Sequence, residues 1–439
     1  MAALLSKSGY RIIPKAERAD IILVNTCAFI LPAKEESIDE ILRMAEWKKG
    51  RKGPCTHLVV TGCLPQRYGR ILEKELPEVD LFLGVGEVPK IAQYLDNLAL
   101  SEPTDRRSVV GKPSFLMDAS YPRLTTTPFY TSYLKIAEGC SNLCSYCVIP
   151  AIRGKARSRD IDDILMEAET LVRGGVKEII ITAQDTTAYG RDLKGKPSLS
   201  VLLKKLAYIK GLHWIRLLYT HPAGLTDEIL KTIANEENIC NYIDIPIQHI
   251  DDEILAAMKR RGRGDLIRKA TQKAREIIPG VALRTSIIVG FPGETQTKFT
   301  RLLSFVRETR FDHLGVFTYS REEGTKAASY PSRITEREKE SRRQLLMEEQ
   351  AVISYDINQS LIGSIQEVMI EGTSGGPDFH YTGRCRRQAL EIDGITYVKG
   401  KSLTIGDIMI CKITAAGDYD LFAEAVSTLD STAKASPLD

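Results

Sequence analysis

The chain of 439 residues has 60 lysines and arginines against 57 aspartates and glutamates, a net charge of +3, so no overall basic field attracts nucleic acid. Hydrophobic residues make up 43% and charged residues 27%, which excludes fibrous and wholly disordered chains and indicates roughly two to four globular domains. Because no apolar run reaches the ~18 residues that cross a bilayer and no export signal is recognisable, we expect a cytoplasmic protein without membrane contact.

The N-terminal region, residues 1–101, alternates strand-like and helix-like segments. Short β-branched runs at 21–25 and 58–61 each end close to a cysteine, and the apolar residues of 34–46 recur with helical spacing. Buried strands that alternate with helices predict an α/β sheet domain. The polar stretch that follows, residues 102–130, contains prolines and glycine and is predicted to be a linker.

The central region, residues 131–360, repeats a strand-then-helix pattern about every 30–40 residues, the length of a βα unit. Its six strand-like runs are residues 133–137, 178–182, 214–219, 242–245, 282–289 and 313–319. Six units are fewer than the eight of a closed barrel, so we predict an open, partial (β/α)6 barrel followed by a charged helix at 335–359.

Polar residues gather where these six strands are expected to end. In parallel α/β barrels the chemistry takes place at the carboxyl ends of the strands. The residues at or near those ends are Glu138, Gln184, Asp185, Tyr219, His221, Gln248, His249, Glu294, Tyr319 and Glu322.

The last region, residues 361–427, alternates short apolar runs with glycine-containing turns and predicts a small antiparallel β-barrel, with a disordered tail at 428–439. Nine acidic and six basic residues between 361 and 426 give this region a net charge of −3. Phosphate binding needs positive charge, so the sign favours a basic protein partner over RNA. Two points stay open: the acidic surface can merely aid solubility, and the segment 259–263 is a contrary basic patch, which can also be a solvated helix end.

Three of the nine cysteines crowd into one short loop. Cys140, Cys144 and Cys147 have the spacing C-x3-C-x2-C directly after the first barrel strand. Three thiolates this close can hold three irons of a [4Fe–4S] cluster and leave the fourth iron open, as a catalytic centre requires. A structural zinc site is the alternative, but it needs a fourth ligand and none lies nearby in the sequence.

This spacing resembles the signature of radical S-adenosylmethionine enzymes, and residues 147–159 resemble the matching loop of the methylthiotransferase family. Asn25-Thr-Cys27, Gly62-Cys63 and the final barrel, similar to a TRAM domain, extend the resemblance over nearly the whole chain. Residues 34–39, 183–190 and 242–249 resemble the branch that modifies ribosomal protein S-twelve, whereas the transfer-RNA branches differ after the second strand.

The resemblance implies a [4Fe–4S] cluster on Cys140, Cys144 and Cys147 that binds S-adenosylmethionine at its open iron and takes electrons from an external donor. It also implies a second [4Fe–4S] cluster with Cys27 and Cys63 as ligands, which supplies or carries the sulfur. The implied reaction adds a methylthio group to the β-carbon of an aspartate in ribosomal protein S-twelve. Two rivals stay open: a transfer-RNA methylthiotransferase, and a non-catalytic RNA- or ribosome-binding protein.

Six residues are candidates for binding the cofactor: Gln184, Asp185, His249, Gly290, Glu294 and Arg153. Simpler alternatives stay open for them. Neighbours can satisfy the buried histidines, Gly290 can be a plain strand-to-helix turn, and Arg153 can belong to a solvated face together with Arg157 and Arg159.

The remaining cysteines need a separate interpretation. Cys27 and Cys63 each follow an apolar strand and lie 36 residues apart, so a parallel sheet would bring them together, although each could be a buried small hydrophobe. Cys240, Cys385 and Cys411 have no sequence partner and are expected to be structural.

The chain departs from the family pattern in two places. The family's first domain carries three cluster cysteines, and the first of them would precede Met1, so the resemblance implies a chain short of one strand and one ligand, with an incomplete second cluster. Cys55 is a less favoured substitute. In the final barrel, Gln388 and Leu390 replace an acidic residue and a proline, which bears on the partner interface and not on the chemistry.

Overall fold

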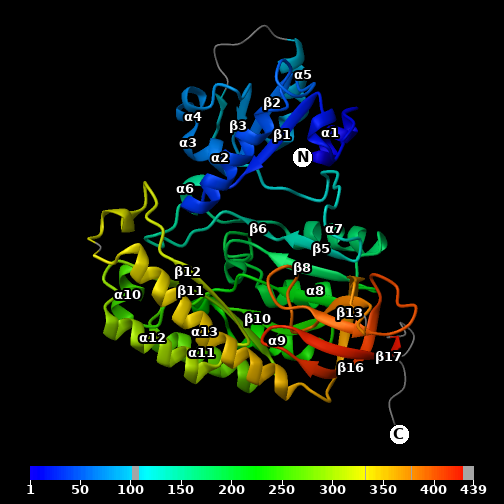
Figure 1. The fold of residues 1–439 in the computed structure, drawn as a ribbon, viewed down its shortest axis with the longest axis vertical. Helices are drawn as coiled ribbons and strands as arrows, with labels where there is room; N and C mark the ends of the chain where they lie inside the picture. The colour runs from blue at the N-terminus through cyan, green and yellow to red at the C-terminus, as the bar shows by residue number, and fades with distance from the viewer. Residues whose placement is uncertain (101–107, 332, 377, 429–439) are drawn as a thin grey trace. The chain divides into compact units, whose positions relative to one another are not determined.

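The computed structural model describes residues 1–100, 108–331, 333–376 and 378–428. The chain divides into two compact units, each of which combines segments that are distant in the sequence (Figure 1). The first unit contains Met1–Thr126, Ala137–Arg159 and Ser320–Tyr330, and the second contains Thr127–Ile136, Asp160–Tyr319 and Pro331–Asp439. No helix of the described ranges is long and apolar enough to cross a membrane.

The first unit is built on a four-stranded parallel sheet of order β1-β2-β3-β4. Its strands are β1 (Ile21–Thr26), β2 (His57–Gly62), β3 (Leu81–Leu83) and β4 (Ser108–Val109). Its helices include α1 (Ala2–Lys7), α2 (Leu31–Ala45), α3 (Cys63–Tyr68), α4 (Arg70–Glu75) and α5 (Ile91–Leu100). The predicted α/β sheet is confirmed.

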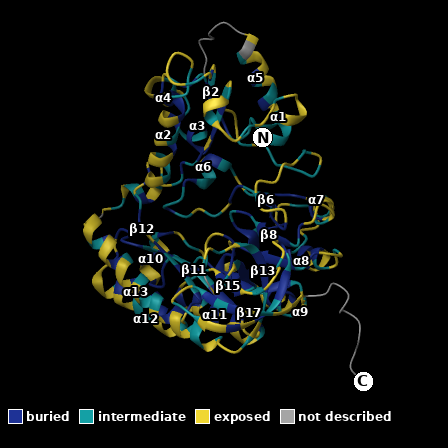
Figure 2. Cartoon of the chain, turned by 45° about the vertical axis from the view of Figure 1, so that its right-hand side comes forward, coloured by how far each residue is buried: buried dark blue, intermediate teal, exposed yellow. Residues whose placement is uncertain are grey.

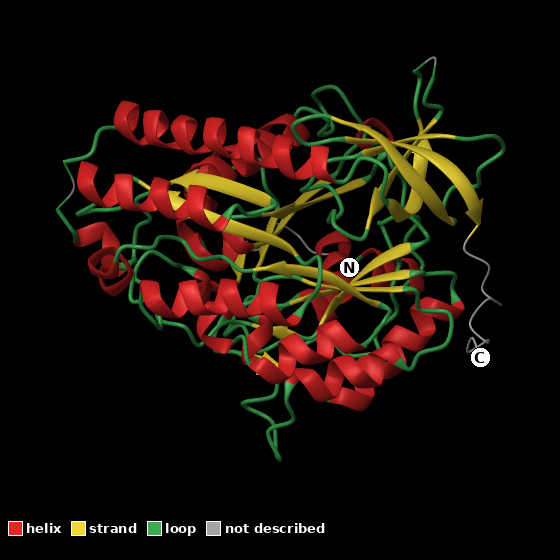
Figure 3. Ribbon diagram, turned by 90° about the horizontal axis from the view of Figure 1, so that it is seen from below, coloured by secondary structure: helices red, strands yellow, loops and turns green. Residues whose placement is uncertain are grey.

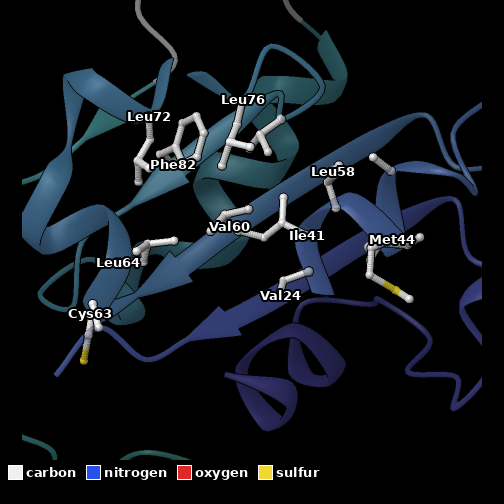
Figure 4. Packing of buried hydrophobic residues seen from close by; sticks show 14 of the residues in the cluster. Val24, Ile41, Met44, Leu58, Val60, Cys63, Leu64, Leu72, Leu76 and Phe82 are labelled. Atoms are coloured by element: carbon white, nitrogen blue, oxygen red, sulfur yellow. The ribbon is translucent and has the colours of Figure 1, made fainter. Parts of the chain in front are cut away.

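Apolar side chains alternate between the two faces of this sheet, as the period of two along a strand requires. Leu58 and Val60 of β2 pack against Ile41 of α2 and Leu72 of α4 (Figure 4). Val59, between them, points to the other face, which α1 and α5 cover. Both faces are therefore buried, as expected for a parallel sheet.

The predicted linker at 102–130 is shorter than expected. Ser108 and Val109 form β4, which pairs with Phe82 and Leu83 and completes the sheet of the first unit. A strand of two residues is too short to give a periodic signal, which is why the sequence pattern missed it. Residues 101–107 of this stretch lie outside the described residues.

The second unit contains an open six-stranded parallel sheet of order β12-β11-β10-β9-β8-β5, which confirms the partial barrel (Figure 1). Its strands are β5 (Thr131–Lys135), β8 (Glu178–Thr182), β9 (Trp214–Leu217), β10 (Ile239–Asp244), β11 (Ala282–Val289) and β12 (His313–Thr318). The strands are largely buried, whereas the helices beside them carry exposed residues (Figure 2).

Helices of this unit accompany the sheet (Figure 3). They are α7 (Ile161–Arg173), α8 (Leu199–Ala207), α9 (Asp227–Asn235), α10 (Asp252–Ala257), α11 (Gly264–Ile277), α12 (Gln296–Thr309) and α13 (Glu336–Ser360). Thr226 caps α9, its hydroxyl accepting from the backbone N of Ile229 at 3.3 Å. Ser198 caps α8 in the same way, accepting from the backbone N of Val201 at 3.4 Å.

The final region forms a closed barrel of order β13-β14-β15-β17-β16. Its strands are β13 (Ile365–Thr373), β14 (Tyr381–Cys385), β15 (Thr396–Lys399), β16 (Ile408–Ala416) and β17 (Leu421–Thr428). The prediction of a purely antiparallel barrel is wrong in one pair, because β15 and β17 run parallel. Strand directions cannot alternate all the way around a closed ring with an odd number of strands, so one parallel pair is unavoidable. Residues 429–439 of the predicted tail are not described.

The closed barrel contacts the amino ends of the parallel strands, within the same unit. Trp214, the first residue of β9, donates from its indole N to Glu367 of the barrel at 3.1 Å. His313, the first residue of β12, has Nε2 2.7 Å from the carbonyl oxygen of Arg387. The carboxyl ends of the strands, where the candidate polar residues lie, are at the other end of the sheet.

A buried ionic network joins the barrel to the sheet. Glu178, the first residue of β8, accepts from Arg216 Nε at 2.9 Å and from Arg384 Nη2 at 2.5 Å. The side chains of Glu178 and Arg216 are wholly buried and that of Arg384 is 3% exposed. Burial alone raises the pKa of Glu178, but Arg384 and Arg216 outweigh it and lower that pKa to about 2.

Candidate active site

The loop with the three clustered cysteines is closed by a small antiparallel ribbon in the first unit. Its strands β6 (Ala137–Glu138) and β7 (Arg157–Ser158) pair with each other, and α6 (Ile149–Arg153) lies between them. The backbone N of Cys140 donates to the carbonyl of Gly154 at 3.1 Å, and the backbone N of Cys147 donates to that of Cys144 at 3.2 Å. The ribbon therefore joins the two ends of the loop, and a backbone hydrogen bond between Cys147 and Cys144 fixes its middle.

The chemistry of this loop suits an iron–sulfur cluster. Cys140 is buried, Cys144 and Cys147 are half-buried, and none of the nine cysteines forms a disulfide. Three sulfur donors within one short loop fit three irons of a cubane. The side chains do not already surround a common point, because no three His, Cys, Asp or Glu residues of the described ranges are grouped as metal ligands.

Cys27 and Cys63 lie at equivalent ends of adjacent strands, as predicted. β1 and β2 pair in parallel with Thr26 opposite Gly62, so the two cysteines follow paired positions directly. Ser37 of α2 fixes the first of them: its hydroxyl accepts from the backbone N of Cys27 at 3.1 Å and donates to its carbonyl at 3.0 Å. The two thiols are close enough to interact electrostatically.

Arg153, at the end of α6, reaches the second of these cysteines. Its Nη2 donates to the sulfur of Cys63 at 3.2 Å, and its Nη1 lies 3.7 Å from the carboxylate of Glu138. Burial raises the pKa of the Cys63 thiol, Arg153 opposes this, and Cys27 and Glu138 add to the increase. Within the first unit, one cation thus connects the cysteine-rich loop with the cysteine pair.

The alternative of a solvated arginine face is wrong. Arg159 is 3% exposed. Arg157 donates through Nη1 and Nη2 to the carbonyls of Arg153, Lys155 and Phe115, at 3.2 to 3.4 Å. Arg157 thus fastens the loop through backbone carbonyls and Arg159 is buried, whereas residue type and spacing alone could not distinguish these positions from solvated ones.

Glu322 is paired with two basic side chains. It belongs to the first unit, where its buried carboxylate is 2.8 Å from both Lys34 Nζ of α2 and Arg67 Nη1 of α3. Those two helices begin just after Cys27 and at Cys63. Glu322 therefore joins the two helices that follow the cysteine pair, a contact between residues some 255 to 288 positions apart that no local pattern reveals.

Glu294 and His249 form a buried polar pair at the carboxyl ends of β11 and β10. Glu294 accepts from the backbone N of Gly290 and, at 3.2 Å, from that of Phe291. His249 Nδ1 accepts from the backbone N of Asp251 at 3.0 Å, and its Nε2 lies 4.0 Å from Glu294 Oε1. Over the described part of the chain, neither His249 Nε2 nor Glu294 Oε1 has a hydrogen-bond partner.

Gly290 is required by both conformation and space. Its φ of +74° is a region that favours glycine, and an added Cβ would collide with the side chain of Lys339. Lys339 in turn donates from Nζ to the carbonyl of Tyr319 at 2.9 Å. The turn after β11 is therefore packed against α13, whose Arg342 Nη1 also lies 3.4 Å from Glu294 Oε1 as an ion pair.

Asp185, next to Gln184 after β8, is held by two neighbours. Thr187 Oγ1 donates to Asp185 Oδ1 at 2.6 Å, and Arg261 Nη2 lies 3.5 Å from Asp185 Oδ2. Arg261 was not singled out from the sequence because its basic segment also fits a solvated helix end. Only the fold brings that segment, between α10 and α11, to the end of β8.

The remaining cysteines are buried. Cys55, Cys240, Cys385 and Cys411 each have no exposed surface, and the sulfur of Cys55 donates to the carbonyl of His57 at 3.3 Å. This agrees with their interpretation as structural residues.

Gln388 also has a local role, since its side-chain oxygen accepts from the backbone N of Cys385 and from Thr396.

Comparison with known families covers most of the chain. Residues 134–306 match the radical SAM superfamily, residues 1–84 match the uncharacterized protein family UPF0004, and residues 362–426 match the TRAM domain. These three ranges correspond to the parallel sheet with its cysteine loop, the N-terminal sheet and the closed barrel.

Two curated relatives are similar along almost their whole length. The "Ribosomal protein uS12 methylthiotransferase RimO" of Syntrophus aciditrophicus is 64% identical over 433 residues, which cover 98% of this chain and 95% of the relative. The protein of the same name from Geobacter sulfurreducens is 51% identical, covering 97% and 95%.

A solved structure supports the fold. The radical S-adenosylmethionine methyltransferase TsrM of Kitasatospora setae matches with a TM-score of 0.53, covering 85% of this chain and 72% of that one, at 15% identity.

Proposed function

Because this chain belongs to the RimO family of ribosomal protein uS12 methylthiotransferases, we propose that it adds a methylthio group to the β-carbon of an aspartate in ribosomal protein uS12. The observation that carries the proposal is identity of 64% over 98% of the chain. A substrate of the ribosome would place the reaction in the cytoplasm.

Cys140, Cys144 and Cys147 would hold a [4Fe–4S] cluster, and S-adenosylmethionine would bind at its open iron. When bound and reduced by an external donor, this pair supplies the radical chemistry that activates an inert C–H bond. The chain's own contribution would be the backbone of the loop: the β6–β7 ribbon joins its two ends, and Arg157 donates to the carbonyls of Arg153, Lys155 and Phe115.

Cys27 and Cys63 would contribute ligands to a second cluster, which would carry the sulfur to be transferred. Their place at paired strand ends supports this role, as does the hydrogen bond from Arg153 to the sulfur of Cys63. A hydrogen bond from a cation stabilises a sulfur that carries negative charge, as a metal-bound thiolate does.

His249 and Glu294 would bind polar groups of S-adenosylmethionine. Since His249 Nδ1 accepts a backbone hydrogen bond, a neutral ring carries its proton on Nε2 and can donate it. Glu294 Oε1, 4.0 Å away, can accept. A bound group that accepts from one and donates to the other would satisfy both buried atoms, and Gln184 and Asp185 would complete this end of the sheet.

The charge of the closed barrel supports a protein substrate over transfer RNA. Three of its six basic residues face inward: Arg384 pairs with Glu178, Arg386 donates to the carbonyls of Glu237 and Ile239, and Arg387 pairs with Asp312. These guanidiniums are not available to phosphates. The acidic remainder suits a basic ribosomal protein.

Mass spectrometry of uS12 from a strain that lacks this gene tests the proposal. Loss of the methylthio mass from uS12, restored by the intact gene and not by the Cys144→Ser form, is expected. If the modification disappears from transfer RNA instead, the protein acts on RNA. If purified reduced protein forms no 5′-deoxyadenosine, it is not catalytic.

A further inference from the structure

His221, which follows β9, has a buried hydrogen-bond donor that nothing in the proposed chemistry uses. The residue is 5% exposed, and its Nδ1 accepts from the backbone N of Ala223 at 3.1 Å. Burial, with Arg260, Arg261 and Arg191 nearby, lowers the pKa of His221 to about 3, although Asp185 opposes this. The ring is therefore neutral at physiological pH and carries its proton on Nε2.

No acceptor meets that proton anywhere in the described ranges. A buried donor without a partner is unfavourable, and a native protein tolerates it mainly where a ligand or water completes the site. Thr187 holds the backbone in place, because its hydroxyl oxygen lies 3.3 Å from the backbone N of His221 and accepts from it. The imidazole is thus fixed from the Nδ1 side, and its Nε2 is left for another group.

The surroundings of this donor are positive. Arg191 Nη2 donates to the carbonyl of Thr187 at 3.3 Å, and Arg260 Nη2 donates to the carbonyl of Pro246, so both are fastened to the backbone. Arg261 is different: its side chain is 49% exposed, and it forms an ion pair of 3.5 Å with Asp185. Three guanidiniums against one carboxylate leave an excess of positive charge beside the imidazole.

We propose that His221 and Arg261 bind the side-chain carboxylate of the substrate aspartate. One carboxylate oxygen would accept from His221 Nε2, and the other would accept from Arg261, which can turn from Asp185 because it is half-exposed and not fixed to the backbone. A phosphate fits less well, since Asp185 would repel its second negative charge. The inference rests on the proposed function, because it assumes that uS12 is the substrate.

The two residues of this site stand apart from the pair His249 and Glu294. His249 and Glu294 follow β10 and β11, whereas His221 follows β9, and Arg261 lies between α10 and α11. Over the described residues, His221 Nε2 is a buried donor without a hydrogen-bond partner at the carboxyl end of the sheet, separate from His249 Nε2 and Glu294 Oε1. A cofactor and a protein side chain both have to be bound at this end, and His221 is assigned to the substrate.

Two substitutions at His221 separate the donor from the structural role of the ring. In His221→Asn, the side-chain oxygen can replace Nδ1 as the acceptor for the backbone N of Ala223, while the Nε2 donor is lost. His221→Gln places an amide N near the former Nε2 and keeps a donor. Arg261→Gln removes the cation, and Arg263→Gln, at an exposed arginine outside the site, is the matched control.

The reconstituted enzyme is assayed for the KM of uS12, the dissociation constant of S-adenosylmethionine, and 5′-deoxyadenosine formed without uS12. His221→Asn and Arg261→Gln should raise the KM about tenfold or more, the loss expected for a hydrogen bond to a charged group, while both cofactor readouts stay unchanged. His221→Gln should lose less, and Arg263→Gln nothing. A uS12 variant with asparagine in place of the modified aspartate provides a second test. The wild-type enzyme should bind this variant more weakly than it binds uS12, whereas the His221→Asn enzyme should bind the two equally.

Three outcomes would overturn the inference: weaker S-adenosylmethionine binding in His221→Asn, which assigns the site to the cofactor; an unchanged KM in both variants; or an equal loss with Arg263→Gln. Failure of the proposed function looks different, because then the wild type itself would not modify uS12.

Discussion

Arg153 Nη2 donates a hydrogen bond to the sulfur of Cys63 at 3.2 Å, and this contact joins two cysteine sets that are far apart in the sequence. Arg153 ends the helix that follows Cys140, Cys144 and Cys147, whereas Cys63 follows the second strand of the N-terminal sheet. Both belong to the first unit. The cysteine-rich loop and the cysteine pair are thus linked through one side chain.

Substitution of Arg153 should weaken iron binding at the cysteine pair and spare the cysteine loop. Arg153→Gln removes the charged donor, and loss of such a supporting group lowers metal affinity about 10- to 100-fold. Arg153→Lys should retain part of the effect, because it keeps the charge but not the planar fork. Iron content and electron paramagnetic resonance after anaerobic reconstitution measure this.

Lys155→Gln, at an exposed neighbour, is the control and should behave as the wild type. An Arg153→Gln protein that binds iron as the wild type does would show that the contact has no such role.

The two cysteine sets should fail in different ways. Cys144→Ser should abolish 5′-deoxyadenosine formation, because the loop loses one of three sulfur ligands. Cys27→Ser should keep 5′-deoxyadenosine formation and lose methylthiolation of uS12, since it changes only the pair. Chromatography of the nucleoside and mass spectrometry of uS12 on the same reaction separate these effects. Cys240→Ser, at a buried cysteine outside both sets, should retain both activities.

Loss of Glu178 should destabilise the second unit. Glu178→Gln leaves Arg216 buried without its carboxylate and Arg384 with Glu371 alone, and breaking a buried pair costs about 3–5 kcal/mol. Thermal unfolding at neutral pH measures the effect. Glu424→Gln, which removes an exposed ion pair of 3.8 Å with Lys399, should change the unfolding temperature little.

Acid should remove the contribution of Glu178 over a defined range. The folded state holds the pKa of Glu178 at about 2, below its unfolded value of about 4.3, so its stabilisation is full above the unfolded pKa and falls as the pH drops toward 2. The wild type should lose this part of its stability between about pH 4.3 and 2, and Glu178→Gln should not. Parallel slopes for the two proteins over that range would contradict the assignment.

Gly290→Ala should disturb the turn after β11. The residue has φ of +74°, and a Cβ would strike the side chain of Lys339, so the substitution brings both backbone strain and a clash. A strained position of this kind costs about 1–3 kcal/mol. We expect a lower unfolding temperature and weaker binding of S-adenosylmethionine by equilibrium dialysis. Gly280→Ala, with positive φ but open space around it, separates strain from clash.

The sequence predicted the elements that depend on local pattern. The bounds of β8 and β11 were predicted to the residue, because β8 contains three consecutive isoleucines and β11 is a run of alternating burial that ends just before Gly290. The alignment of Cys27 with Cys63 also followed, since parallel neighbours place equivalent ends side by side. β4 and the parallel β15–β17 pair were missed because they depend on sheet completion and barrel closure.

The contacts of long side chains could not be predicted in the same way. Arg153, Arg261 and Glu322 are flexible in the unfolded chain, and their partners come from other segments of the fold. Their charge could be read from the sequence, but their partners could not: Arg153 contacts the sulfur of Cys63, Arg261 pairs with Asp185, and Glu322 pairs with basic residues of two helices. Identification of the substrate likewise required the full-length relatives.

Methylthiolation of uS12 in a defined reaction tests the central claim most directly. Purified, anaerobically reconstituted protein is incubated with uS12, S-adenosylmethionine, sulfide and a reductant, and uS12 is analysed by tandem mass spectrometry. We predict a methylthio group in place of one hydrogen on a single aspartate, absent with the Cys144→Ser protein. Unmodified uS12, in a reaction that still forms 5′-deoxyadenosine, would contradict the claim.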